Sequence, residues 1–256
     1  MKTDLILAMS GNDIFSGGGL YADLATYMSQ GQHGFVAVTC LTAMTEHGFE
    51  VIAVDEKVFA QQLASHKETP FAAIKLGLLP NVAIADLALD YIKAHPEIPV
   101  VLDPVLVCKE SHDVEVSSLR QELLKFFPYA SIITPNLAEA ALLAQMEIES
   151  LEDMKQVAQI LRDLGAKHVV IKGGKRLAGE LALDLFYDGQ DFTLLEQPLL
   201  ERNNVGAGCT FASSIASHLA KGQSALEAVR AAKTFVHQAI QNSDNYGVQQ
   251  YACKQS

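Results

Sequence analysis

The feature that most constrains this chain is a repeated alternation of short aliphatic runs with longer segments of helical spacing. Several of the short runs are apolar at successive positions, rather than at every second one. Strands that are apolar on both faces are typical of a parallel sheet that is covered by helices on both sides. The alternation therefore predicts an α/β fold, with a doubly wound, mostly parallel sheet and right-handed crossovers. The expected strands are residues 4–9, 35–41, 74–79, 99–106, 131–134 and 168–172.

Helix-length segments separate these strands. The clearest one carries apolar residues at steps of three and four from Leu151 to Leu164 and ends at Gly165. A late antiparallel hairpin is indicated by residues 183–187 and 192–195, which flank an Asp-Gly turn. The polar tail after Asn242 is expected to fray, and one domain over residues 1–256 accommodates the whole pattern. The other expected helices are residues 19–30, 82–94, 117–126, 138–144, 210–221 and 225–240.

Charge and hydropathy narrow the possible partners. Nineteen Lys and Arg stand against thirty Asp and Glu, a net charge of −11, which opposes nonspecific binding to nucleic acid. No apolar run approaches the roughly 20 residues that span a bilayer, so no membrane partner and a cytoplasmic location are expected. The four cysteines lie far apart without a C-x-x-C pair, which argues against a disulfide scaffold and a zinc site.

A glycine-rich turn at residues 203–211 is the strongest candidate for an anion site. It contains Gly206, Ala207, Gly208 and Cys209 and leads into a helix of small residues. The amides and partial positive charge of a helix N-terminus suit a phosphoryl group, and the same field lowers the pKa of a thiol. The plainer alternatives are a simple tight turn and a buried cysteine without chemistry.

Polar residues also follow other strands, where ligands of a doubly wound sheet bind. Asp103, in L-D-P-V, could hold Mg²⁺, or only initiate an Asp-Pro turn. Glu139, in T-P-N-x-x-E, has the spacing of a capping box with Asn136, and this local reading is favoured. Lys172 and Gly174, in I-K-G-G, leave room for phosphates beside a cation.

The first strand is followed by a polar and glycine-rich stretch. Asp13, in S-G-N-D, could bind a hydroxyl or ring nitrogen of a ligand, and the glycines from Gly17 to Gly19 permit a flat ring to approach the backbone. A solvated loop is the alternative reading.

Over about residues 5 to 240, the ordered set of motifs resembles that of the ribokinase-like superfamily. The motifs are, in order, S-G-N-D, S-G-G-G, A-D, L-D-P-V, T-P-N-x-x-E, I-K-G-G and G-A-G-C-T-F. Within this superfamily, the chain is similar to the branch of hydroxymethylpyrimidine (phosphate) kinases and vitamin B6 kinases. The pair Cys108 and Cys209 looks like that of the dual-cysteine pyridoxal kinases. Met44 falls where the pyrimidine kinases typically present a glutamine, which also favours pyridoxal.

This resemblance implies transfer of the ATP γ-phosphate to the 5′-hydroxymethyl group of pyridoxal. Cys108, on a small flap over the active site, would add to the aldehyde as a hemithioacetal, and Cys209 would take the hydroxyl proton. The amides from Gly206 to Cys209 would stabilise the transferring oxygens. By the same resemblance, Asp103 and Glu139 would bind Mg²⁺, and Asp13, Gly19 and Met44 would contact the substrate ring. The residues that would lie near the nucleotide are Glu139, Lys172, Gly174 and Lys109.

Two departures and two alternatives accompany the resemblance. Val205 stands where relatives commonly have a histidine, which removes a polar group beside the anion site, and Glu110 stands where they usually have a glycine, which adds a negative charge where ATP would approach. A pyrimidine kinase of thiamine synthesis and a non-catalytic protein that binds B6 vitamers remain open. The resemblance further suggests a homodimer, and it leaves open whether K⁺ assists and whether pyridoxine and pyridoxamine are accepted.

Overall fold

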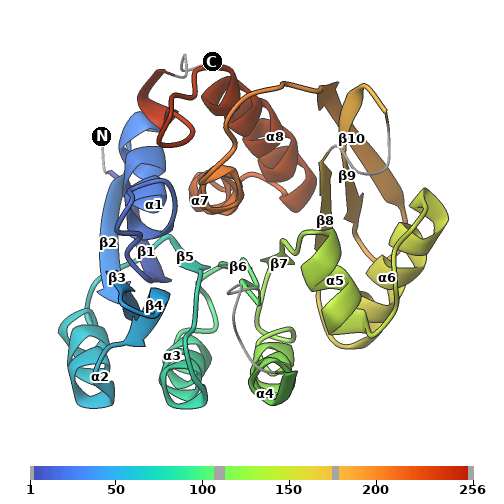
Figure 1. Ribbon diagram of the computed structural model, residues 1–256. Coiled ribbons are helices and arrows are strands. Elements are labelled where there is room, and N and C mark those ends of the chain that lie inside the picture. Colours follow the sequence, from blue (N-terminus) through green and yellow to red (C-terminus); the bar gives the residue numbers. More distant parts are fainter. Residues whose placement is uncertain (1–2, 107–112, 175–178, 253–256) are drawn as a thin grey trace.

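The computed structural model describes residues 3–106, 113–174 and 179–252. Within these ranges, eight strands form one sheet in the order β10-β9-β8-β7-β6-β5-β1-β2 (Figure 1). The six strands from β2 to β8 in this order pair in parallel, whereas β9 and β10 are antiparallel at one edge. The predicted doubly wound, mostly parallel sheet and the late hairpin are confirmed. The strands are β1 (Leu5–Ser10), β2 (His33–Val38), β5 (Ala73–Leu76), β6 (Val100–Leu102), β7 (Ile132–Ile133), β8 (Val169–Gly174), β9 (Leu181–Tyr187) and β10 (Phe192–Pro198).

Helices cover the two faces of this sheet in two separate layers (Figure 1). One layer consists of α1 (Gly19–Ser29), α7 (Ala207–Ala220) and α8 (Ala225–Gln241). The other consists of α2 (Glu56–Ser65), α3 (Val82–Ala94), α4 (Asp113–Leu124), α5 (Leu137–Ala144) and α6 (Leu151–Asp163). Strand β1 shows why both faces had to be apolar. Its Ile6 and Ala8 pack into one core and its Leu7 and Met9 into the other, and all four are fully buried.

The chain departs from the predicted strand at residues 35–41. The strand β2 ends at Val38, and Cys40 begins a separate two-stranded hairpin of β3 (Cys40–Thr45) and β4 (Gly48–Ala53). Thr39 causes the break, because its amide donates to Ser10 O at 3.0 Å and its hydroxyl to Leu78 O at 2.7 Å. These bonds hold the backbone at the end of the sheet while the chain turns away. Neither this hairpin nor the helix α2 is among the sequence-based expectations.

The tail after Asn242 does not fray within the described residues, contrary to the sequence-based expectation. Val248 and Gln250 are buried, and residues Gln250–Ala252 form a short 3₁₀ helix. The Gln250 amide donates to Thr210 Oγ1 at 2.8 Å, and the Gln249 amide N–H donates to Ala239 O at 3.0 Å. The tail is therefore packed against α7 and α8 by bonds that its polar composition does not reveal. Over the described ranges, no helix has both the length and the apolar character that crossing a bilayer requires.

Candidate active site

The first turn of α7 lies directly against the loop that opens α1. Gly206 caps α7 with a φ of 83°, and a Cβ atom added there would lie 1.7 Å from Gly17 O. A Cβ on Gly18 would lie 3.8 Å from the sulfur of Cys209. The first-turn amides of Gly208 and Cys209 have no intrahelical acceptor, and no side chain of the described residues caps α7 in its place. The two glycine-rich loops thus bring a helix N-terminus and a thiol to one place.

The Gly19 amide lies close enough to the Cys209 thiol to lower its pKa. Burial raises the pKa of this thiol above its ordinary value, and the nearby Lys75 ammonium opposes the rise only in part. The expectation that the helix N-terminus lowers this pKa is therefore wrong. The sequence shows the helix start, but it does not show that the half-buried sulfur shares its surroundings with Asp23 and Asp103.

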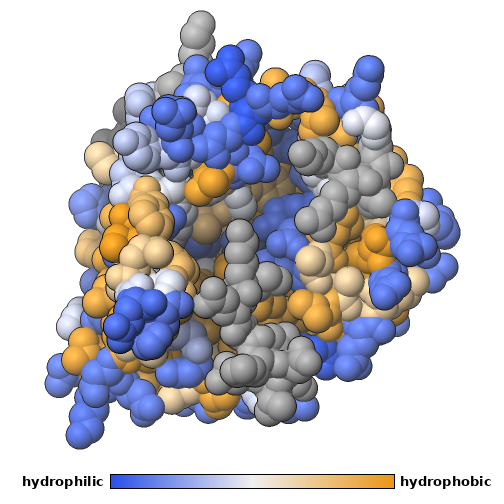
Figure 2. Space-filling model, in the orientation of Figure 1, coloured by the Kyte–Doolittle hydropathy of each residue, from blue (hydrophilic) through white to orange (hydrophobic). Residues whose placement is uncertain are grey.

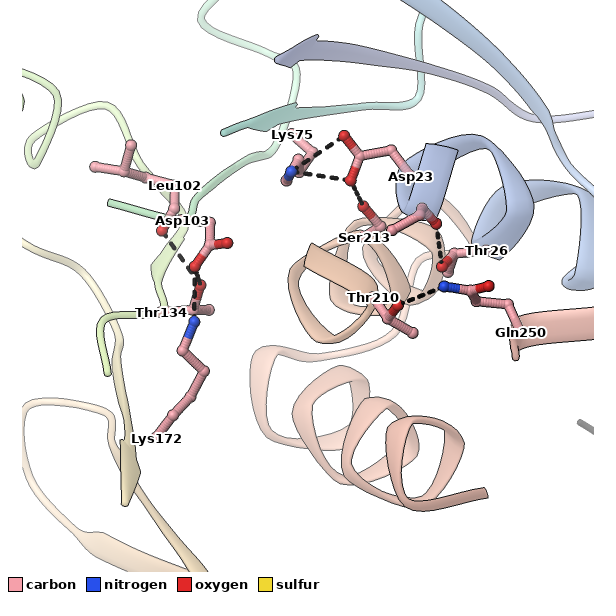
Figure 3. Close-up of polar contacts among 11 residues, drawn as sticks. Asp23, Thr26, Lys75, Leu102, Asp103, Thr134, Lys172, Thr210, Ser213 and Gln250 are labelled. Carbon is pink, nitrogen blue, oxygen red and sulfur yellow. Dashed lines mark hydrogen bonds and ion pairs between the residues drawn. The ribbon is translucent and has the colours of Figure 1, made fainter. Parts of the chain in front are cut away.

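A second polar group lies at the carboxyl ends of β6, β7 and β8 (Figure 3). Lys172 Nζ donates to Asp103 Oδ1 at 2.7 Å, and Thr134 Oγ1 donates to the same oxygen at 3.1 Å. Burial raises the pKa of Asp103, but the Lys172 and Lys75 ammonium groups outweigh it and hold that pKa below its ordinary value. A Cβ on Gly208 would lie 3.4 Å from Lys172 Nζ. The lysine therefore joins this carboxylate to the N-terminus of α7.

Glu139 combines a structural role with an unusual electrostatic setting. Its Oε2 accepts from the Asn136 amide at 2.8 Å, while Asn136 Oδ1 accepts from the Glu139 amide at 3.0 Å. The capping box that the sequence favours is confirmed. The pKa of Glu139 is raised to about 7. Burial is the largest cause, the Asp103 carboxylate adds to the rise, and the Lys172 ammonium opposes it. Glu139 is thus only partly ionised at neutral pH and lies within the field of both groups.

Asp103 and Glu139 suit a magnesium ion that takes its remaining oxygen ligands from water and from a bound phosphate. Asp103 and Glu139 are both buried carboxyl groups, and the Asp103 carboxylate helps to keep Glu139 only partly ionised at neutral pH. Among the described residues, no three His, Cys, Asp or Glu side chains gather as a metal site would require. Mg²⁺ binds through one or two carboxylates together with waters and phosphate oxygens, so the donor set suits it when phosphate is present.

The loop after β1 is shaped by Asp13. Its Oδ1 accepts from the Phe15 amide at 2.9 Å and its Oδ2 from the Gly18 amide at 2.8 Å. Gly19 has a φ of 54°, and a Cβ there would lie 2.3 Å from Gly11 O. Asp13 thus folds the loop over the start of α1, and its carboxylate retains lone pairs for a further donor.

Met44 lies on the face of the β3–β4 hairpin that looks toward the Asp13 loop. Thr42, two residues before it and on the same face, accepts from the Ile14 amide at 2.9 Å through Oγ1. Phe49, the cross-strand partner of Met44, stacks on Phe15 at a centroid distance of 6.4 Å. Figure 2 shows apolar side chains gathered near the hairpin beside a hollow in the middle of this face.

The remaining expected site residues are placed as follows. Gly174 ends β8 in a left-handed conformation, and a Cβ added there would meet no atom of the described residues within 4 Å, its chain neighbours aside. Val205 is half exposed, and a Cβ on Gly17 would lie 2.4 Å from its Cγ1. Cys108, Lys109 and Glu110 lie outside the described residues.

Sequence reasoning missed a buried cluster behind Cys209. Lys75 on β5 is fully buried and donates to Asp23 on α1, and Ser213 on α7 donates to the same carboxylate (Figure 3). The signal that could have found it is a lysine inside the apolar run of β5, because a buried lysine needs a charged partner.

The chain is similar in sequence and fold to several known kinases. The family model of phosphomethylpyrimidine kinase matches residues 13–254. The chain is 37% identical over 253 residues to the pyridoxine kinase of Bacillus subtilis, with 95% of this chain and 92% of the relative covered. It resembles an ADP complex of B. subtilis pyridoxal kinase with a TM-score of 0.92 and 36% identity, covering 98% of both chains. The pyridoxal kinase of Staphylococcus aureus in complex with AMP-PCP and pyridoxal matches with a TM-score of 0.89 and 35% identity, covering 98% of this chain and 95% of the other.

The family model covers nearly the whole chain, and the fold agrees over its full length with solved kinases of the same branch. The resemblance to the ribokinase-like hydroxymethylpyrimidine and pyridoxal kinases is thereby confirmed. The chain belongs to the phosphomethylpyrimidine kinase family.

Proposed function

We propose that this protein transfers the γ-phosphate of ATP to the 5′-hydroxymethyl group of pyridoxal in vitamin B6 salvage. The observation that carries the proposal is the convergence of three groups: the uncapped N-terminus of α7, the Lys172–Asp103 pair and the Cys209 thiol. Relatives named pyridoxine kinase and pyridoxal kinase, some solved with ADP or with AMP-PCP and pyridoxal, support the choice of substrates.

The N-terminus of α7 supplies the positive end of the site. The transferring phosphoryl group spreads its charge over three oxygens, so fixed donors are the main way to stabilise it. The amides of Gly208 and Cys209 and the Lys172 ammonium are such donors, and the close approach of Gly208 to Lys172 Nζ brings them together. Asp103 and Glu139 would hold Mg²⁺, which would neutralise phosphate charge when bound.

Cys209 lies where the acceptor hydroxyl would meet this cradle. Its sulfur touches the opening of α1, which is the side of the Asp13 loop, and it belongs to the first turn of α7. In our proposal the hydroxyl proton passes to Cys209 Sγ as the phosphoryl group is transferred. Because the pKa of the thiol is raised, its thiolate form is scarce at neutral pH and a strong base when present.

The substrate ring would lie between the Asp13 loop and the hairpin. Asp13 would bind a polar atom of the ring, Gly19 would allow it to approach the backbone, and Met44 with Phe49 would offer apolar contact. Cys108 would capture the aldehyde as a hemithioacetal, and Lys109 and Gly174 would lie near the nucleotide phosphates. These roles extend the family resemblance to the residues of this chain.

The decisive experiment measures ADP release by the purified protein with Mg·ATP and one of three acceptors: pyridoxal, pyridoxine or hydroxymethylpyrimidine. We expect turnover of pyridoxal that requires Mg²⁺ and that Cys209→Ala nearly abolishes. Turnover of the pyrimidine alone would refute the proposal, and no ADP with any acceptor would leave a B6-binding protein. Repeating the assay in K⁺ and Na⁺ buffers tests whether K⁺ assists.

A pyrimidine kinase of thiamine synthesis is the second candidate, and the family model that matches the chain favours it. Met44 bears on the choice between the two candidate functions, because its side chain lacks the amide that a glutamine at this place would offer to a pyrimidine ring. We expect Met44→Gln to raise turnover of hydroxymethylpyrimidine relative to pyridoxal, whereas Met44→Leu leaves the ratio unchanged. An unchanged ratio in Met44→Gln would remove Met44 from substrate selection.

The same proposal includes a homodimer that uses the outer face of the hairpin. Leu41 and Ile52 pair across the two strands on the face opposite Met44, and about half of each side chain is exposed. Exposed paired aliphatic side chains are typical of a face that is covered in an assembly. Sedimentation should give a dimer for the native protein and a monomer for Leu41→Asp.

A further inference from the structure

The polar cluster of Asp23, Lys75 and Ser213, behind Cys209, takes no part in the mechanism above. Lys75 Nζ donates to Asp23 Oδ1 at 2.9 Å and Oδ2 at 3.1 Å, and Ser213 Oγ donates to Oδ1 at 2.6 Å (Figure 3). The three side chains come from β5, α1 and α7, and all are fully buried. A buried ion pair is costly to desolvate and contributes little to stability compared with an apolar replacement. Its presence here therefore calls for a reason other than stability.

Helix geometry places this cluster one turn below the reactive thiol on both helices. Asp23 follows Gly19 by four residues on α1, and Ser213 follows Cys209 by four residues on α7. Residues four apart lie on the same face of a helix, one above the other. The two helices therefore meet at two levels: the Gly19 amide with the Cys209 sulfur, and Asp23 with Ser213.

We propose that Asp23, Lys75 and Ser213 are positioning residues for Cys209, which hold the two helix starts together and place an ammonium group behind the thiol. This inference rests on the proposed function for its meaning in catalysis. The Lys75 charge favours the thiolate of Cys209, and the Asp23 charge disfavours it, so the pair adjusts how readily the sulfur gives up and takes a proton. Ser213 fixes the carboxylate without adding charge.

Charged and titratable groups from several elements face the thiol. Lys75 on β5 and Lys172 on β8 are cationic, whereas Asp23 on α1 and Asp103 after β6 are acidic, and Tyr27 lies one turn beyond Asp23. Lys75 has the largest electrostatic effect among those on Cys209. Removing one charge of the buried pair should therefore change the thiol in a direction that depends on the sign removed.

The test is the rate at which iodoacetamide alkylates Cys209 from pH 6 to pH 10, measured on the Cys209 peptide by mass spectrometry. Asp23→Asn should speed alkylation at pH 7.5 by about threefold or more, because removing a neighbouring negative charge favours the thiolate, which is the form that reacts. Lys75→Met should slow it by a similar factor. Asp23→Asn combined with Lys75→Met should fall between the single variants, and Ser213→Ala, which removes a bond between the helices but no charge, should change the rate by less than either single variant.

If the cluster had a merely structural role, either single variant would loosen the site and speed alkylation. Faster alkylation in both variants, or unchanged rates in both, would overturn the proposal. Asp184→Asn is the matched control, because Asp184 forms another buried ion pair, with Lys233 of α8 at 2.6 Å. It should leave Cys209 alkylation unchanged. If Lys75→Met does not fold, as circular dichroism would show, Lys75→Gln takes its place, because only the loss of the lysine charge separates slower alkylation from the faster alkylation of a loosened site. The assay needs neither nucleotide nor vitamer, so its outcome is independent of the kinase assay.

Discussion

Replacing Gly206 by alanine should damage both the stability and the activity of this protein. The residue has a φ of 83°, in the left-handed region, which costs an alanine about 1–2 kcal/mol. Its new Cβ would lie 1.7 Å from Gly17 O, where real Cβ atoms keep at least 3.0 Å. The Asp13 loop must then withdraw by more than about 1 Å, and such overpacking typically costs about 1–3 kcal/mol.

Together these costs amount to about 3 kcal/mol, which lowers the melting temperature by roughly 10 °C in a protein of this size. Thermal unfolding followed by circular dichroism measures that shift, and ADP release with Mg·ATP and pyridoxine measures the accompanying loss of turnover. The loss of turnover follows because the withdrawn loop carries Gly19, whose amide contacts Cys209.

Gly208→Ala is the matched control, two residues further along the same turn. Its Cβ would meet only the Lys172 ammonium, at 3.4 Å, and its backbone is helical. We expect no loss of stability, since alanine favours helix over glycine, but a fall in turnover on the order of tenfold because the methyl group occupies the proposed phosphate cradle. A Gly206→Ala protein that melts and turns over like the native one would refute the reasoning about this close contact.

Three further predictions follow from the same groups. Cys108→Ala should reduce turnover of pyridoxal but spare pyridoxine, which has no aldehyde, and equal losses in the ADP assay would contradict the hemithioacetal. Turnover of pyridoxine should rise up to about tenfold per pH unit from pH 7 to 9, because the raised pKa of Cys209 keeps the thiolate a minor species; a flat profile would argue against a base role for the thiol. Glu139→Gln should abolish Mg·ATP turnover yet gain stability relative to the native protein as pH rises from 5 to 8. The reason is that the pKa of the native carboxyl is raised from 4.5 to about 7, so the folded native protein loses up to about 3 kcal/mol of stability as this group ionises with rising pH. Thermal melts in which the two proteins keep a constant difference across this range would contradict it.

The arrangement of layers could be predicted from the sequence because it depends on local patterns. Runs such as residues 4–9 and 168–172 are apolar on both faces, which only a covered parallel sheet satisfies, and helical spacing sets the segments between them. The motifs stand directly after strands, so the topology alone brings Asp103 and Lys172 to one edge of the sheet. The break at Thr39 could not be predicted, because it depends on hydrogen bonds to Ser10 and Leu78 rather than on residue type.

The layered α/β fold, the family and the set of polar residues at the strand ends could all be read from the residues in order. The raised pKa of Cys209, the packing of the C-terminal tail and the buried cluster of Asp23, Lys75 and Ser213 became visible in the folded chain alone. The physical reason is distance along the chain: Lys75 bonds a carboxylate 52 residues away, and Ser213 bonds the same one 190 residues away. Desolvation and Coulomb effects act between groups that folding brings together, and no local pattern records them.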